Sequence, residues 1–215
     1  MKNNRLTVAL VLGFFISSSL LWSKAESKMQ VPNQKEAVAY FSGGCFWCVE
    51  AVYESVKGVS EAISGYAGGT TLNPTYEQVG YGQSDHAETV EVHYNPELIS
   101  FAELVKLFFG SHDPTTLNRQ GPDTGTQYRS IAFYSNEAEK KIIEDHIAQL
   151  TADGVYDRPI VTEVKSIGIF YKAEDYHQNY ESNNPFSPYI INVSKPRFNR
   201  FKQNYSEYLK DDHDE

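Results

Sequence analysis

The sequence predicts an α/β (α+β) domain in which helices cover a mixed sheet as a two-layer sandwich. Segments with strand-like alternation and segments with helix-like periodicity follow one another along the chain, an order typical of such a sheet. No Pro/Ser-rich linker and no internal repeat divides residues 26–215, which are numerous enough to bury a sizeable core. We therefore expect residues 26–215 to form a single domain.

Residues 1–25 have the pattern of a signal peptide. Lys2 and Arg5 form a basic start, an apolar run extends from Leu6 to Trp22, and Ser23-Lys24-Ala25 offers a small-x-small cleavage site. An uncleaved signal anchor is the alternative, because the apolar run nears the lower limit for crossing a bilayer. We expect cleavage after about Ala25, which predicts an exported protein, periplasmic or secreted.

Charge narrows the range of partners. Removal of Lys2, Arg5 and Lys24 changes the formal net charge from −9 to −12. Such an acidic balance argues against nucleic acid and against an anionic membrane surface as partners, beyond the signal segment itself. We expect a monomer.

The first predicted elements surround the two cysteines. Residues Glu36–Phe41 are strand-like, and the segment Cys45–Val56 is predicted to be a helix because Val49, Val52 and Val56 fall on one face.

The middle of the chain continues the alternation. Thr89–Tyr94 alternates as a strand does, and Asn95-Pro96 ends it. Ser100 and Glu103 then form a capping box, which predicts the start of a second helix.

Two further strands and a helix follow. Ile131–Tyr134 is predicted to be a strand, Asn136–Leu150 a helix ended by Gly154, and Ile160–Ile167 another strand. The last third of the chain is turn-rich, polar and aromatic, and we expect a long irregular C-terminal part.

One connection is too long for a simple turn. Ser111–Arg129 has no periodicity of its own, and loops of this length in compact domains are usually functional or disordered. Tyr128 and Arg129 favour a functional loop.

The only cysteines are Cys45 and Cys48, in the stretch "SGGCFWCVE". A helix N-terminus lowers the pKa of a thiol, and Gly43 and Gly44 leave room for a substrate, so we expect Cys45 to be exposed and reactive. Cys48 lies one helical turn later and is positioned to attack it. A redox or nucleophilic pair is favoured, and a structural bridge is the main alternative. Half of a zinc site is disfavoured because no second cysteine pair exists and the histidines lack ligand spacing. No metal is expected.

Six blocks in order resemble the A-type peptide methionine sulfoxide reductases. They are "GCFWCVE", "GYAGG", "NPTYEQV", "HAETVEVHYNP", "GPDTGTQYRS" and "AEDYHQNY", and the resemblance extends over residues 36–200. It implies that the protein reduces the S epimer of methionine sulfoxide, free or in proteins, and thereby repairs oxidative damage. The predicted fold is then a ferredoxin-like two-layer sandwich.

The resemblance also implies roles for single residues. Cys45 attacks the sulfoxide sulfur, while Glu88 meets the oxygen with the help of Tyr76 and Tyr128. Aromatic neighbours would keep the carboxyl protonated. Asp123 corresponds to another polar residue of the family's site.

Phe46 and Trp47 resemble the aromatics that receive the substrate's methyl group, and they suit an apolar ligand pocket.

Many family members have glycine at the position of Cys48 and keep resolving cysteines elsewhere. Here Cys48 is the candidate that condenses with the Cys45 sulfenic acid, and a thioredoxin-type donor would reopen the disulfide. No cofactor is implied. A thioredoxin-like disulfide exchanger is the alternative, since a lone CxxC at a helix start is its usual sign.

Overall fold

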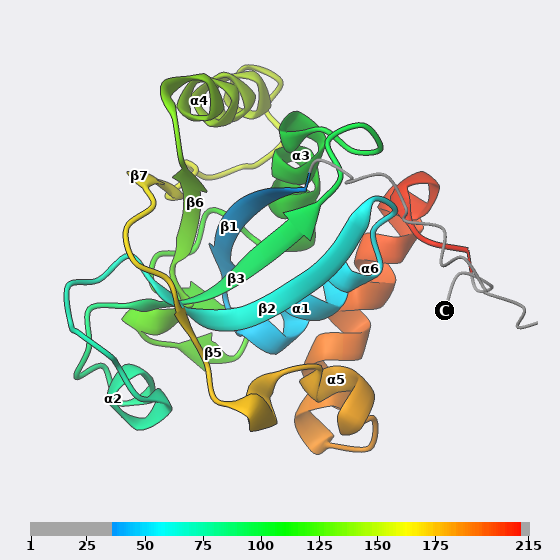
Figure 1. The fold of residues 1–215 in the computed structure, drawn as a ribbon. Coiled ribbons are helices and arrows are strands. Elements are labelled where there is room, and N and C mark those ends of the chain that lie inside the picture. Colours follow the sequence, from blue (N-terminus) through cyan, green and yellow to red (C-terminus); the bar gives the residue numbers. More distant parts are fainter. Residues whose placement is uncertain (1–35, 212–215) are drawn as a thin grey trace, which may run out of the picture. The chain divides into compact units, whose positions relative to one another are not determined.

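A six-stranded sheet is the centre of the computed structural model, which describes residues 36–211 (Figure 1). The signal peptide predicted for residues 1–25 lies outside the described residues. The strands are β1 (Ala37–Gly43), β2 (Val59–Ala67), β3 (Ala87–Tyr94), β6 (Ser130–Tyr134), β7 (Glu163–Ser166) and β8 (Tyr171–Lys172). Their order is β7–β6–β1–β3–β2–β8, and β6 and β7 pair in parallel while the other neighbours are antiparallel. The sheet is therefore mixed, as predicted.

Helices follow most of these strands. They are α1 (Phe46–Glu54), α2 (Tyr76–Gly80), α3 (Phe101–Ser111), α4 (Glu137–Ala152), α5 (Tyr180–Asn183) and α6 (Lys195–Tyr205). No helix within residues 36–211 is both long and apolar enough to cross a membrane.

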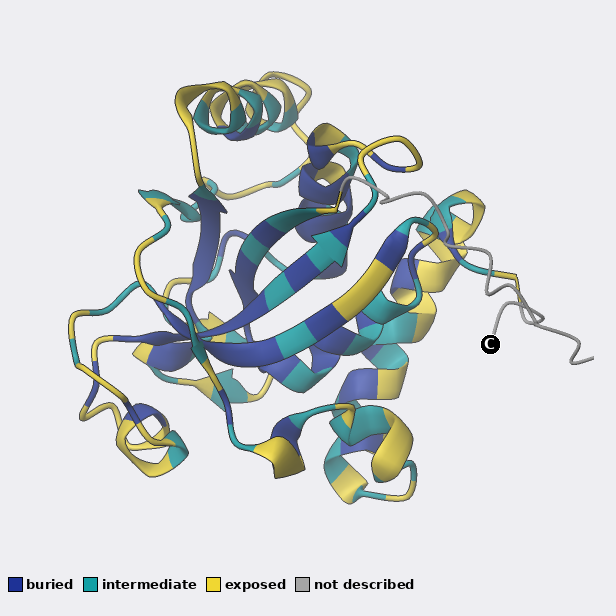
Figure 2. Cartoon of the chain, in the orientation of Figure 1, coloured by how far each residue is buried: buried dark blue, intermediate teal, exposed yellow. Residues whose placement is uncertain are grey.

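The main core lies between the sheet and α1 and α3. Phe41 of β1 is fully buried, and its ring stacks 5.2 Å from that of Tyr53 on α1 and 5.0 Å from that of Phe108 on α3. Figure 2 shows buried residues along β1, β3 and β6, whereas exposed residues gather on α4. Apolar burial of this kind drives the packing of the helices on the sheet.

A smaller apolar cluster covers the opposite face of the sheet. Ala87, Ile131 and Phe133 are buried there, and Ile167 and Phe170 from the chain between β7 and β8 pack against them. Alternate side chains on β3 therefore point to the two opposite faces of the sheet. Glu88 lies on the same face as Val90, the face that α1 and α3 cover.

Most predicted elements are present. The capping box of Ser100 and Glu103 starts α3, Asn136 caps α4, and β7 is shorter than the strand predicted for Ile160–Ile167. The strand β2 was not predicted. Gly65 weakens its pattern, and a register shift between Val59 and Glu61 interrupts its alternation.

The C-terminal part is more regular than predicted. It contains α5, a π-helix (Ile190–Ser194) and the 11-residue helix α6. On α6 only Arg197 and Phe201 are buried, so the sequence carries no apolar stripe that would predict this helix.

The segment Ser111–Arg129 is an ordered excursion rather than an unstructured loop. It contains a short hairpin, β4 (Arg119–Gln120) with β5 (Asp123–Thr124), and a 3₁₀ helix (Thr126–Tyr128). These pieces bring Asp123 and Tyr128 toward the start of α1.

Candidate active site

The two cysteines lie at the beginning of α1. Cys45 is the N-cap residue, and Cys48 follows within the first turn. Both thiols are free and both residues are buried, with 6 % of Cys45 and 3 % of Cys48 exposed. The expectation that Cys45 is exposed was therefore wrong, because β3, the aromatic residues and the C-terminal segment close over the start of the helix.

The electrostatics of the pair also differ from the prediction. Burial, together with the hydrogen bond to Cys48, raises the pKa of the Cys45 thiol. The hydrogen bond from Cys45 lowers the pKa of Cys48 to about 6, and the positive charge of Arg197 acts in the same direction. The first N–H of α1, that of Phe46, is bonded to Glu88 rather than left for a Cys45 thiolate. Of the two thiols, Cys48 therefore has the lower pKa and loses its proton first.

Glu88 faces this pair from β3. It is only 2 % exposed, and its Oε2 accepts the Phe46 N–H at 2.9 Å. Burial raises the pKa of its carboxyl to about 8, although the Phe46 N–H opposes this shift. A carboxyl with this pKa is mostly protonated at neutral pH and can donate a proton.

The two predicted tyrosines both lie close enough to Glu88 and Cys45 to interact with them electrostatically. Tyr76 is the first residue of α2, and Tyr128 ends the 3₁₀ helix after β5. Burial raises the pKa of both phenols, and the charges of Glu88 and Cys45 add to the shift in each case. Both phenols therefore stay protonated and able to donate hydrogen bonds near the carboxyl.

Asp123 is held by a residue that the sequence analysis did not single out. Its Oδ2 accepts the hydroxyl of Tyr189 at 2.6 Å, and the oxygen of Tyr189 lies 3.8 Å from Cys48 Sγ. Burial raises the pKa of Asp123, while Tyr189 and Arg197 oppose the shift. The predicted Asp123 is thus connected to Cys48 through Tyr189.

Phe46 and Trp47 belong to an aromatic cluster beside Cys45. Trp47 stacks on Tyr180 with 3.7 Å between ring centroids, and its indole N–H donates to Nδ1 of His177 at 3.2 Å. The ring of His177 also lies 5.0 Å from that of Phe46 and 4.3 Å from that of Tyr76. Such a cluster can receive an apolar group next to the nucleophile.

The expectation that Gly43 and Gly44 leave room for a substrate was wrong. A Cβ on Gly43 would lie 3.1 Å from Phe108, and a Cβ on Gly44 would lie 2.6 Å from Gln120. Gly44 also has φ +93°, which favours glycine. Protein side chains occupy this space, so the glycines permit close packing behind the nucleophile.

All eight predicted site residues meet at the start of α1, and the structure adds others from the C-terminal part. His177 and Tyr180 belong to the block "AEDYHQNY", which carried the resemblance but received no role. Tyr189 and Arg197 lie in no recognised motif, and only their place in the fold identifies them.

Comparisons with known proteins agree with this arrangement. The family model described as peptide methionine sulfoxide reductase matches residues 37–209. The peptide methionine sulfoxide reductase MsrA of Deinococcus radiodurans is 44 % identical over 193 residues, which are 90 % of this chain and 94 % of that protein. The MsrA of Chromobacterium violaceum is 48 % identical over 172 residues, 80 % of this chain and 98 % of that protein.

Solved structures give the same result. Mxr1 from Saccharomyces cerevisiae in reduced form is similar with a TM-score of 0.65 and 34 % identity, covering 75 % of this chain and 92 % of Mxr1. Methionine sulfoxide reductase A of Corynebacterium diphtheriae has a TM-score of 0.63 and 37 % identity, covering 71 % of this chain and 76 % of that one. The chain described here belongs to the peptide methionine sulfoxide reductase family.

Proposed function

We propose that the protein reduces the S epimer of methionine sulfoxide, free and in proteins, through a sulfenic acid on Cys45 and a disulfide with Cys48. The observation that carries the proposal is the neutral, buried Glu88 carboxyl beside the buried thiol pair. A sulfoxide oxygen leaves sulfur only when it is protonated or strongly hydrogen-bonded, and Glu88 can supply that proton.

The first step is attack on the sulfoxide. Cys48, which carries the negative charge of the pair, takes the proton of Cys45. The Cys45 thiolate then attacks the sulfoxide sulfur while Glu88 protonates the oxygen. The S–O bond of the substrate breaks, and methionine leaves with both electrons of the reduction. Cys45 keeps the oxygen as a sulfenic acid.

The substrate is oriented by the aromatic cluster. The methyl group of the sulfoxide packs against Phe46 and Trp47, and Tyr76 and Tyr128 hydrogen-bond its oxygen next to Glu88. These contacts exclude water and fix the sulfur toward Cys45.

The second step regenerates the thiol. Cys48 attacks the sulfur of the Cys45 sulfenic acid, the S–S bond forms, and the S–O bond breaks. The hydroxyl and the proton of Cys48 leave together as water. A thioredoxin-type dithiol protein then reduces the disulfide, which joins residues only three positions apart and is therefore strained and easily reduced.

Two further proposals concern the whole protein. Residues 1–25 direct export to a periplasmic or extracellular location, supported by their basic start, apolar run and cleavage pattern. The strand order β6–β1–β3–β2, with α1 and α3 as crossovers, supports a ferredoxin-like unit as the scaffold. The N-terminal residue of the protein recovered from its source tests the proposal of export.

The decisive assay compares substrates and variants. The reduced protein should convert methionine S-sulfoxide, and not the R epimer, with dithiothreitol, whereas a disulfide exchanger would instead reduce insulin. Cys45→Ser should be inactive. Cys48→Ser should form about one equivalent of methionine, accumulate a sulfenic acid that dimedone traps, and fail to turn over with a thioredoxin-type donor. Full turnover of Cys48→Ser with that donor would show that Cys48 does not resolve the sulfenic acid.

A further inference from the structure

Glu50 carries a buried carboxyl that the proposed reaction does not use. It lies on α1, two residues after Cys48, and is 1 % exposed. None of the ion pairs found among residues 36–211 includes it. Its Oε1 accepts the backbone N–H of Asn179 at 3.2 Å. A buried carboxyl is costly unless it is hydrogen-bonded, so this contact is the place to look for a role of Glu50.

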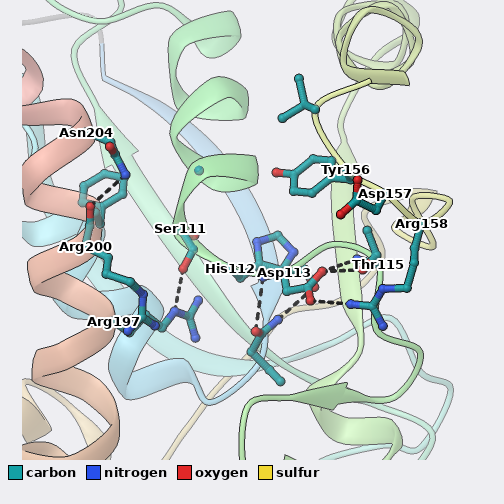
Figure 3. Close-up of a pocket in the computed structure, with 14 residues that line it drawn as sticks. Ser111, His112, Asp113, Thr115, Tyr156, Asp157, Arg158, Arg197, Arg200 and Asn204 are labelled. Atoms are coloured by element: carbon teal, nitrogen blue, oxygen red, sulfur yellow. Dashed lines mark hydrogen bonds and ion pairs between the residues drawn. The ribbon is translucent and has the colours of Figure 1, made fainter. Parts of the chain in front are cut away.

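The carboxylate of Asp113 shows a different use of an acidic side chain in the same protein. Figure 3 shows Asp113 on the wall of a cavity of about 460 Å³, where Arg158 pairs with it at 2.9 Å. The hydroxyl of Thr115 donates to the same carboxylate at 2.6 Å. Glu50 does not line this cavity and instead bonds the main chain of a residue 129 positions away in the sequence. Its contact therefore joins two distant segments rather than pairing two charges.

Asn179 is the residue at which the C-terminal segment turns into α5, which lies against α1 (Figure 1). Its φ of +53° and ψ of +35° are in the left-handed region, and its side chain makes no capping hydrogen bond to α5. A residue other than glycine keeps this conformation only where its surroundings support it. The carboxyl of Glu50 gives such support, because it holds the N–H of the turning residue.

The turn at Asn179 lies between two residues that contact the ring of Trp47. Tyr180 follows the turn directly and stacks on Trp47, with 3.7 Å between ring centroids and 9° between ring planes. His177 precedes the turn by two residues, and its Nδ1 accepts the indole N–H at 3.2 Å. Both contacts come from one short segment, so the position of the Trp47 ring depends on the backbone conformation at Asn179.

The other anchors of this segment lead to the sheet. Gln178 accepts the backbone N–H of Ser64 on β2 and donates to its carbonyl, each at 3.0 Å. Glu174 accepts the hydroxyl of Tyr66, also on β2, at 2.8 Å. Within residues 36–211, the bond of Glu50 is the one that joins a side chain of α1 to the backbone of residues 174–180. It therefore sets how this segment lies against the helix that carries the cysteines.

We propose that Glu50 is a positioning residue for the substrate pocket, because its bond to Asn179 fixes the turn that holds the ring of Trp47. The proposal rests on the proposed function, in which Trp47 receives the methyl group of the sulfoxide. Glu50 exchanges no atom with the substrate and acts through the neighbouring segment. A pocket that is held in shape before the substrate arrives binds it without the cost of ordering the ring.

Two substitutions separate the hydrogen bond from the packing. Glu50→Gln keeps a carbonyl oxygen that can accept the Asn179 N–H, whereas Glu50→Leu fills a similar volume and removes the acceptor. Burial raises the pKa of Glu50 to about 8, so glutamate and glutamine are both largely uncharged here at neutral pH. Glu54→Leu is the matched control, since Glu54 lies one turn later on α1 and none of the hydrogen bonds found among residues 36–211 joins its carboxyl to Asn179.

Trp47 supplies a direct readout of the pocket. The chain has two tryptophans, so each variant is made in the full chain with Trp22→Phe, which leaves Trp47 as the one fluorophore of this type. In Glu50→Leu we expect the emission of Trp47 to shift to longer wavelength and its quenching by acrylamide to increase, because the indole loses its packing. Glu50→Gln and Glu54→Leu should keep the wild-type emission. Thermal unfolding checks that every variant is folded.

The kinetic effect should appear in substrate binding. In single turnover at neutral pH, the concentration of methionine S-sulfoxide that gives half the maximal rate should rise about tenfold in Glu50→Leu, the scale set by a buried N–H left without an acceptor. The rate constant at saturation should change less than about threefold, since the thiols and Glu88 are untouched. Glu50→Gln should restore the wild-type concentration dependence.

A double-mutant cycle shows whether Glu50 acts through the ring stack. Tyr180→Leu removes the stack on Trp47 and should itself raise the half-saturating concentration of the sulfoxide. In the Tyr180→Leu background, Glu50→Leu should have a much smaller effect than in the wild type, because both changes disturb the same ring. Fully additive effects of the two substitutions would overturn the proposal.

An unchanged emission of Trp47 in folded Glu50→Leu would also overturn it, as would equal changes in Glu50→Gln and Glu50→Leu, since only the second loses the acceptor. If the wild-type protein formed no methionine from the sulfoxide, the proposed function would be refuted. The emission of Trp47 in Glu50→Leu would then still decide whether Glu50 positions this ring.

Discussion

The substitution Glu88→Gln tests the role of the neutral carboxyl most directly. Glutamine has the same shape, and its Oε1 can still accept the Phe46 N–H that Glu88 accepts at 2.9 Å. It can donate a hydrogen bond to the sulfoxide oxygen but cannot transfer a proton. The variant therefore removes only the acid function.

The size of the effect follows from the environment of Glu88. With a pKa of about 8, roughly nine in ten of the carboxyls are protonated at pH 7, against less than about one in a hundred at the ordinary pKa of 4.5. General acid catalysis contributes about 10²–10⁴-fold. We expect the single-turnover rate constant for methionine formation to fall by about 10² or more in Glu88→Gln at pH 7.

The pH dependence has a definite sign. The protonated carboxyl is the active form, so the wild-type rate constant should fall as the pH rises through about 8. In Glu88→Gln, the part of this fall in the rate constant that is caused by deprotonation of Glu88 should be absent. Rapid-quench measurement of methionine between pH 6 and 10 records both effects.

Glu91→Gln is the matched control for this experiment. Glu91 lies on the same strand but on the opposite face of the sheet, where its carboxylate accepts a hydrogen bond from His93 at 2.9 Å. The rate constant for methionine formation in Glu91→Gln should stay near that of the wild type. Thermal unfolding should show that both Glu91→Gln and Glu88→Gln are folded. A Glu88→Gln rate constant within a few-fold of the wild type would remove Glu88 from the mechanism.

Two further predictions concern stability and export. Glu50 on α1 is 1 % exposed, and burial raises the pKa of its carboxyl to about 8. Between pH 4.5 and 8 the folded chain therefore holds a proton that the unfolded chain has lost. The free energy of unfolding should fall as the pH rises through this range. Glu50→Gln should reduce that decline by up to about 1.4 kcal/mol per pH unit in urea unfolding, and an unchanged slope would contradict the assignment. The mature protein recovered from its source should begin near Glu26 and lie outside the cytoplasm, whereas an intact Met1 in a cytoplasmic fraction would exclude cleavage and export.

Local signals account for the parts of the fold that were predicted. The capping box of Ser100 and Glu103 and the N-cap Asn136 satisfy backbone N–H groups within a few residues, so they can be recognised without tertiary information. The strand β2 could not be recognised in this way. Its Gly65 is required because Phe170 and Tyr171 approach within 2.5 Å of where a Cβ would lie, and this contact crosses more than 100 residues.

The candidate site, like the fold, could be predicted from the sequence only in part. Cys45, Glu88 and Asp123 each belong to a block that the family resemblance covers, so the sequence alone could single them out as candidates. The pKa values of the thiols were not predictable, since they depend on the hydrogen bond between the two thiols and on burial, with a smaller contribution to Cys48 from Arg197, which lies 149 positions later in a segment without a motif. A helix N-terminus alone would have placed the charge on Cys45.

Burial of the site favours the neutral form of Glu88, which is the acid, and also the neutral form of Cys45, which is the nucleophile. The desolvation that keeps Glu88 protonated also raises the pKa of Cys45, so the same environment that prepares the acid opposes the nucleophile. In the proposed mechanism Cys48, whose pKa is lowered, holds the negative charge of the pair and accepts the proton of Cys45 when substrate arrives. The second thiol then has two successive tasks in that mechanism, as the base for the first step and as the nucleophile for the second. A glycine at position 48 could perform neither, so a chain without Cys48 would need another group to take up the proton of Cys45.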